Sequence, residues 1–271
     1  MRADTYLRPA SLEEALAAKA SKPEAVFLAG GTYLLSSDRG AACGRDYVDV
    51  SRLLPRALER RGAELVVGAG ATFQDLLDSA AAPASLKAAA ASMAARNVRN
   101  RATVGGNLGA GKSCASLVPI LLVLDARVEA AQGPGAGRVS LPLAAWLERP
   151  QGLLLDVILP LEAGERRSFQ RWGRSACDVS VLTAAASYRL EGDGTARGLA
   201  VAAGGLGPRA RRFPEIEQLF EGKRLPSAPE MEEAIRPFLS PIDDLRGSAA
   251  FKRLRGAALI ADAIAKAEAE A

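Results

Sequence analysis

Up to Pro160, short apolar runs alternate with segments that carry helix signals. The apolar runs predict strands within residues 25–35, 47–53, 64–68 and 153–160. Helices are expected over residues 11–20, from 72 onward and over 80–96. Two of these helices follow Ser11 and Thr72, which are residue types that cap helix N-termini. This alternation is typical of an α/β or α+β layered arrangement.

The pattern changes after Pro160. Residues 162–167 are polar and predict a linker, and residues 180–207 predict two strands about the turn EGDG, with a third strand before them. From Pro214 onward three segments show helical spacing instead. We therefore expect a second unit, in which a three-stranded antiparallel sheet precedes helices, and we place the boundary near residue 163.

Composition allows a full core of small apolar side chains. Hydrophobic residues make up 49% of the 271 residues but aromatics only 5%, so Ala, Val and Leu must fill the interior. The net charge is +4, and the basic residues are scattered apart from Arg209, Arg211 and Arg212. We interpret that cluster as a solvated loop and expect no nucleic-acid interface.

Several classes of chemistry are excluded. The chain has no histidine, so it cannot use histidine triads, imidazole bases or histidine metal ligands. Cys43, Cys114 and Cys177 are isolated, which predicts buried thiols in a reducing compartment and neither a zinc site nor an iron–sulfur cluster. The N-terminus lacks signal-peptide character and no apolar stretch reaches 18 residues, so we expect a cytoplasmic protein without a membrane span.

The stretch GGNLGAGKS, Gly105–Ser113, matches the phosphate loop of nucleotide triphosphatases. Such a loop lies between a buried strand and a long helix. Here only residues 102–104 could form the strand, and Pro119 would fall inside the helix, which costs about 3 kcal/mol. Asp156 is a candidate for the magnesium ligand that the motif needs. A nucleotide triphosphatase therefore remains an alternative.

A second interpretation comes from two similar segments. LAGGT (28–32) and TVGGN (103–107) each combine an expected strand, two glycines and a small polar residue. Glycines let a backbone approach a ligand and direct consecutive amides at phosphate oxygens. The pair suggests two loops that close on one dinucleotide, and two ordinary turns are the alternative. GAGATF (68–73) is an incomplete dinucleotide fingerprint, with Phe73 at the third glycine position.

Several stretches together resemble the FAD-binding medium subunit of molybdenum hydroxylases, the xanthine dehydrogenase and carbon monoxide dehydrogenase flavoprotein family. FLAGGTYLL resembles its first flavin loop and RNRATVGGNLGAGKSCASLVPILLVLDARV its second. FQRWGRSACDVSVLTAAAS, AVAAGGLGPRARRFPEIEQLFEGK and SPIDDLRGSAAFKRLRGAALIADAI resemble its C-terminal domain. The likeness runs from about Tyr6 to the last helix.

The resemblance implies an α+β fold with two domains. Residues 1–163 would form a two-lobed FAD-binding domain of the vanillyl-alcohol oxidase (PCMH) type, with lobes of about 1–55 and 56–163. Residues 164–271 would form the C-terminal flavoprotein-subunit domain, with a three-stranded antiparallel sheet and a helical bundle. The coarse pattern of strands and helices agrees with this division.

FAD is the implied cofactor, with no catalytic residue and no metal ligand in this chain. The first loop would donate amides and a hydroxyl to the FAD diphosphate, and Asn107 is a candidate partner for phosphate or the flavin edge. Trp172 is a candidate for ring stacking or for apolar packing. The implied cofactor-binding residues are Phe27, Leu28, Ala29, Gly30, Gly31, Thr32, Tyr33, Leu34, Ala102, Thr103, Gly105, Gly106, Asn107, Ser116, Leu155 and Gln170.

The sequence departs from the family pattern at two of these positions. Tyr33 and Ser116 stand where the family usually has aspartates. Losing a charged hydrogen bond costs about 1.5–3 kcal/mol, which would weaken FAD binding. Lys112 is a candidate to compensate by neutralising phosphate. A flavin-free structural subunit is therefore a further alternative.

The family implies a role within a complex. A molybdenum-cofactor large subunit would oxidise the organic substrate and a 2Fe–2S small subunit would release electrons. This chain would relay them through FAD to NAD or another acceptor. On this interpretation GNLGAGKS binds dinucleotide phosphate without magnesium, and Lys112 matches the triphosphatase motif by chance.

Overall fold

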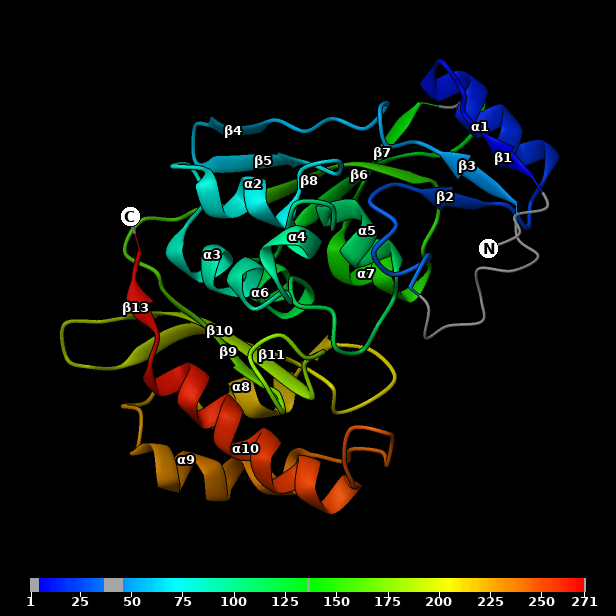
Figure 1. Cartoon of the computed structure of the whole chain (residues 1–271). Helices are drawn as coiled ribbons and strands as arrows, with labels where there is room; N and C mark the ends of the chain where they lie inside the picture. The colour runs from blue at the N-terminus through cyan, green and yellow to red at the C-terminus, as the bar shows by residue number, and fades with distance from the viewer. Residues whose placement is uncertain (1–4, 37–45, 136, 271) are drawn as a thin grey trace.

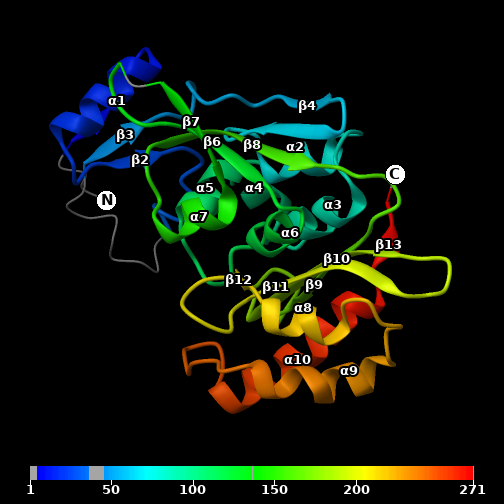
Figure 2. The same cartoon turned by 180° about the vertical axis from the view of Figure 1, so that it is seen from behind.

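The computed structural model of the chain describes residues 5–36, 46–135 and 137–270; Cys43 lies outside them. Three sheets and the helices between them form layers (Figure 1). Seen from both sides, helices α2 to α6 lie between the sheet of β4 to β8 and the sheet of β9 to β11, and α8 to α10 lie beyond the latter (Figure 2).

The first lobe is a small parallel sheet with one helix. Strands β1 (Tyr6–Leu7), β3 (Tyr47–Asp49) and β2 (Val26–Leu28) pair in that order, and α1 (Leu12–Ser21) packs on β3. The hydroxyl of Ser11 accepts the amide of Glu14 at 3.1 Å, so the predicted cap is confirmed. The strand expected over residues 47–53 ends at Asp49, so that prediction is wrong beyond this residue. The chain forms a turn there, in which the amides of Leu53 and Leu54 donate to the carbonyl of Val50.

The second sheet is antiparallel throughout. Its strands are β4 (Leu58–Arg61), β5 (Glu64–Gly68), β8 (Leu153–Pro160), β6 (Arg127–Ala131) and β7 (Arg138–Pro142), in this spatial order. The strands predicted over 64–68 and 153–160 are confirmed. Their apolar runs are almost wholly buried, whereas β4 and β7 are largely exposed and gave no apolar signal.

Six short helices, α2 to α7, follow the first lobe within the described part of the first domain. They are α2 (Phe73–Asp78), α3 (Ala84–Ala91), α4 (Arg96–Arg99), α5 (Val104–Gly109), α6 (Val118–Val123) and α7 (Leu143–Glu148). Thr72 caps α2 as predicted, with Asp75 completing a reciprocal capping box. Burial raises the pKa of Asp75, but hydrogen bonds from Thr72 and pairing with Arg56 outweigh it and lower the pKa overall.

Two expectations for this helical layer are wrong. The single helix over 80–96 is interrupted, because the chain turns after α3, with Ala94 at a φ of 32°, before α4 begins. The strand expected over 102–104 is absent: the Thr103 hydroxyl accepts the amide of Gly106 at 3.1 Å and so caps α5. Pro119 lies in the first turn of α6, where its missing amide is not needed.

The third sheet is antiparallel and consists of three long strands with short edges. β9 (Arg166–Trp172), β10 (Leu182–Leu190) and β11 (Ala196–Gly204) are the predicted strands, flanked by β13 (Glu268–Ala269) and β12 (Arg211–Arg212). β9 begins within the expected linker. The three predicted helices after Pro214 are confirmed as α8 (Pro214–Phe220), α9 (Ala228–Ile235), which continues into a 3-10 helix (Arg236–Phe238), and α10 (Ala249–Ala265).

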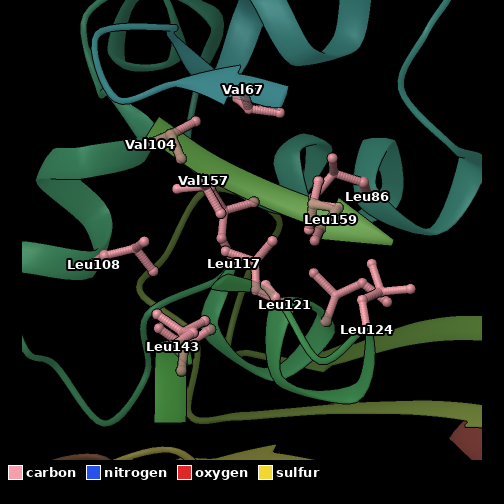
Figure 3. Close-up of a cluster of buried hydrophobic side chains, with 14 of the residues drawn as sticks. Val67, Leu86, Val104, Leu108, Leu117, Leu121, Leu124, Leu143, Val157 and Leu159 are labelled. Carbon is pink, nitrogen blue, oxygen red and sulfur yellow. The ribbon is translucent and has the colours of Figure 1, made fainter. Parts of the chain in front are cut away.

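The main core joins both halves of the chain. Val67 and Val157 of the second sheet pack with Leu86 of α3 and Leu121 of α6 (Figure 3). The same cluster includes Phe169 of β9 and alanines of β10 and β11, since α3 and α6 also pack on the third sheet. The predicted boundary near residue 163 falls between β8 and β9 and stays a prediction, because the hydrophobic core continues across it.

The C-terminal tail also ties the halves together. Glu270 accepts hydrogen bonds from the amide (2.5 Å) and the hydroxyl (2.8 Å) of Ser85, in the first turn of α3. α3 has no side-chain cap of its own, because Pro83 precedes it. Glu270 also lies 3.6 Å from the buried guanidinium of Arg167 on β9. The residue that follows the last strand therefore caps the N-terminus of a helix 185 residues earlier in the sequence.

Candidate functional site

A cleft of about 1820 Å³ opens between the first lobe, the segment around α5 and the loop between β9 and β10. A volume of this size exceeds that of a typical small-ligand pocket and suits a long ligand. The predicted site residues that line it are Phe27, Ala29, Gly30, Gly31, Thr32, Tyr33, Leu34, Ala102, Thr103, Gly105, Gly106, Asn107 and Ser116.

The two glycine segments converge at one edge of this cleft. The Arg101 guanidinium donates through Nε to the carbonyl of Gly30 at 3.3 Å. A side-chain carbon at Gly30 would lie 2.7 Å from the carbonyl carbon of Arg101 and closer still to its oxygen, so only glycine permits this approach. Segments that are about 70 residues apart are thus in backbone contact.

The first segment presents amides that have no partner. After β2 the chain turns at Gly31, whose φ is +74°, a conformation that favours glycine. Within the described residues, the amides of Gly30, Gly31 and Thr32 donate no hydrogen bond. Consecutive amides of this kind form a concavity that binds anions. The first loop therefore fits a diphosphate, as the FAD hypothesis requires.

The second segment is built differently. The amide of Gly105 donates to the carbonyl of Ala69 at 2.8 Å, and the amides of Gly106 and Asn107 donate to the Thr103 side chain and carbonyl. The side-chain oxygen of Asn107 accepts the amide of Leu117 at 3.2 Å. The two glycine segments were expected to bind phosphate in the same way, and this expectation is wrong. The amides of the second segment donate to acceptors inside the protein, whereas those of the first have no acceptor among the described residues.

The geometry of a triphosphatase loop is not met. Gly106 lies inside α5, which ends at Gly109, and the next helix, α6, begins only at Val118. Lys112 and Ser113 therefore stand in an irregular segment with no strand directly before Gly106. Asp156 does not line the cleft; it lies on β8, 3.5 Å from Arg138, and burial raises its pKa.

Three predicted residues lie away from the cleft walls. Leu28 is buried at the end of β2, and Leu155 packs in the apolar cluster between the first lobe and β8. Gln170 lies on β9 opposite Ala184 of β10. Trp172 packs edge-on against Phe251 with ring centroids 5.0 Å apart, in line with the packing alternative.

The arginine cluster is more than a solvated loop. Arg209 donates to the carbonyls of Leu147 and Glu148 at the end of α7, and Arg212 pairs with Asp125 and Glu217. The segment after β11 therefore joins the C-terminal domain to the first domain. That role depends on partners distant in the sequence, which is why charge spacing alone did not indicate it.

The C-terminal domain supplies a further wall that the sequence did not indicate. Val179, Leu245 and Arg246 line the cleft, and Leu245 is fully exposed. Lys252 anchors the segment that carries Leu245 and Arg246. Its buried ammonium donates to the carbonyl of Ile242 at 3.0 Å and pairs with Asp244 at 2.8 Å. A lone lysine inside a helical pattern gave no signal for this role.

Most charged groups in the cleft are already paired. The ammonium of Lys19 donates to backbone carbonyls, Asp46 pairs with Lys22, Asp178 with Arg174, and Arg246 lies 3.7 Å from Asp244. The hydrogen bond from Lys22, followed by one from Thr5, lowers the pKa of Asp46. Lys112 differs, because its ammonium lies 4.7 Å from the ring centroid of Tyr33.

The layered α+β fold, with two glycine segments at one long cleft, defines a two-lobed dinucleotide-cofactor protein. Comparison with known families makes this specific. Residues 2–162 match the FAD binding domain in molybdopterin dehydrogenase, and residues 167–267 match the CO dehydrogenase flavoprotein C-terminal domain. The chain belongs to this family of FAD-binding flavoprotein subunits, so FAD as cofactor and the oxidoreductase class are confirmed.

Individual relatives cover nearly the whole chain. YgfM of Escherichia coli K12, an uncharacterized protein, is 30% identical over 96% of this chain and 94% of its own. The xanthine dehydrogenase FAD-binding subunit of Escherichia coli O157:H7 is 29% identical over 92% of this chain and 90% of its own. A chain of Hydrogenophaga pseudoflava carbon monoxide dehydrogenase superposes with a TM-score of 0.88 at 24% identity, covering 98% and 97% of the two chains, and confirms the fold.

Two general features complete the site. In the ranges that the structure covers, no helix has the length and apolar character needed to cross a bilayer. Within those ranges, His, Cys, Asp and Glu side chains form no group of three or more that could hold a metal ion. Cys114 and Cys177 are free thiols that line the cleft. The prediction of buried thiols is confirmed for Cys114 and is wrong for Cys177, which lies exposed in the loop between β9 and β10.

Proposed function

We propose that this chain is the FAD-carrying medium subunit of a molybdenum-hydroxylase complex and relays electrons from a partner's iron–sulfur clusters to NAD or another acceptor. The observation that carries the proposal is the cleft, a volume suited to a dinucleotide that is lined by three amides without a partner among the described residues. Relatives named as a xanthine dehydrogenase FAD-binding subunit and a nicotine 6-hydroxylase medium subunit support the assembly with a molybdenum large subunit and a 2Fe–2S small subunit.

The residues of this chain act by binding, orientation and shielding. Gly30, Gly31 and Thr32 would hold the diphosphate with their amides, while Thr103 and Ser116 form the opposite wall with their buried hydroxyls. Bound FAD supplies redox chemistry that can accept electrons singly and release them in pairs. With no histidine in the chain, we assign no acid–base step to the protein. The free thiols also favour a cytoplasmic location.

The proposal is tested on the purified chain and on its complex. After incubation with FAD and desalting, the protein should keep flavin absorbance bands, and the co-expressed complex should reduce NAD or a dye when given its organic substrate. A colourless protein that joins the partners would favour the flavin-free structural subunit. A colourless protein with magnesium-dependent ATP cleavage that is lost in Lys112→Ala would favour the triphosphatase.

A further inference from the structure

Lys112 is a cation in the cleft that has no anionic partner in the described part of the chain. It follows Gly111, whose φ is +59°, and it lines the cleft together with the first loop. Within the described residues its ammonium makes no hydrogen bond or ion pair, but it makes a cation–π contact with the ring of Tyr33. Glu24, another charged residue of the cleft, is not within ion-pair distance of it. Among the residues that the structure describes, the charge of Lys112 is therefore not compensated by an anionic group.

The position of this charge matters because of what lies next to it. Tyr33 directly follows Thr32, the last residue of the unpartnered amide run. The Tyr33 contact therefore brings the ammonium to a side chain of the first loop, next in sequence to the amide run. A cation–π contact at a partly exposed site stabilises by only about 0.5–1 kcal/mol, and it leaves the three N–H donors of the ammonium available.

We propose that Lys112 binds the diphosphate of the cofactor, together with the amides of Gly30, Gly31 and Thr32. The inference rests on the proposed function, since it assumes that FAD occupies this cleft. The ammonium supplies the full charge that the amide dipoles lack, and the amides supply directional hydrogen bonds. The lysine of the apparent triphosphatase motif thus serves diphosphate binding that needs no magnesium.

The test compares ligands that differ in the diphosphate. Dissociation constants for FAD, riboflavin and ADP are measured in EDTA for the wild type, Lys112→Gln and Lys112→Arg. The loss of one charge-assisted contact should weaken FAD and ADP binding by about 10- to 100-fold in Lys112→Gln, with riboflavin binding unchanged. Lys112→Arg should retain most of the affinity. Added salt should weaken FAD binding less in Lys112→Gln than in the wild type.

Lys87→Gln is the matched control. Lys87 lies on α3 outside the cleft, and its side chain has no hydrogen bond or ion pair within the described residues. The Lys87→Gln variant should therefore bind FAD, riboflavin and ADP with the same dissociation constants as the wild type. The melting temperature of the unliganded protein should also stay the same in Lys112→Gln, while its rise on adding FAD should shrink.

Three results for Lys112→Gln would overturn the inference. The first is an FAD affinity equal to that of the wild type, and the second is a loss of riboflavin affinity as large as the loss of FAD affinity. The third is a melting temperature of the unliganded variant so low that unfolding explains the weaker FAD binding. Failure of the proposed function is recognised separately. If the wild type binds neither flavin, the FAD assignment fails, and ADP binding then decides the role of Lys112. ADP binding that is lost in Lys112→Gln would still support a diphosphate site.

Discussion

Gly30→Ala is predicted to damage both stability and FAD binding. The added methyl group would lie 2.7 Å from the carbonyl carbon of Arg101, and closer to its oxygen, where real side-chain carbons essentially never come within 3.0 Å. Because both sides of the contact are backbone, no rotamer change can relieve it. The two glycine segments must separate, which we expect to cost about 1–3 kcal/mol, as for other overpacked sites.

The assay is thermal unfolding together with FAD titration. A loss of 1 kcal/mol lowers the melting temperature of a chain of this size by about 2–4 °C, so a drop of several degrees is expected. Moving the unpartnered amides should also weaken FAD binding at least tenfold. Gly192→Ala is the control, because nothing lies within 4 Å of the added carbon in that turn. A Gly30→Ala protein that melts and binds FAD like the control would refute the reasoning.

Three further predictions concern contacts outside the diphosphate loop. Glu270→Ala should lose about 1–2 kcal/mol in thermal unfolding, since α3 loses its cap, whereas the exposed Glu268→Ala should be neutral. Lys252→Met removes the hydrogen bond to the Ile242 carbonyl and the ion pair with Asp244, should cost about 1–3 kcal/mol as contacts of a charged group, and should speed tryptic cleavage after Arg246. Asp75→Asn should destabilise at neutral pH; because the folded pKa is lowered, the difference from the wild type should disappear as pH falls below about 4 through that pKa.

Local chemistry explains the features that sequence could predict. Ser11 and Thr72 cap helices by bonds to amides three residues away, so the signal and its partner lie in one short segment. The strands over 64–68 and 153–160 could be predicted equally well, because they are buried on both faces and therefore appear in the sequence as continuous apolar runs. β4 and β7, which are exposed edge strands, carry no comparable pattern.

Distant partners explain what sequence could not predict. The break between α3 and α4, the Glu270 cap on α3 and the contacts of Arg209 all depend on residues brought together by folding. The family resemblance supplied the two-domain fold and the cofactor, because it compares the order of motifs over the whole chain. It did not indicate that the amides of the second motif are bonded inside the protein.

The sequence by itself determined that two glycine pairs exist, that no histidine chemistry is available and that the chain contains FAD-family segments. Only the tertiary structure decided that the pairs differ. The amides of Gly105 and Gly106 are bonded to Ala69 and Thr103, while those of Gly30 and Gly31, which also line the cleft, have no acceptor among the described residues. The physical reason is that an amide can bind a ligand only if the fold provides it with no other acceptor, and that depends on neighbours far away in the sequence.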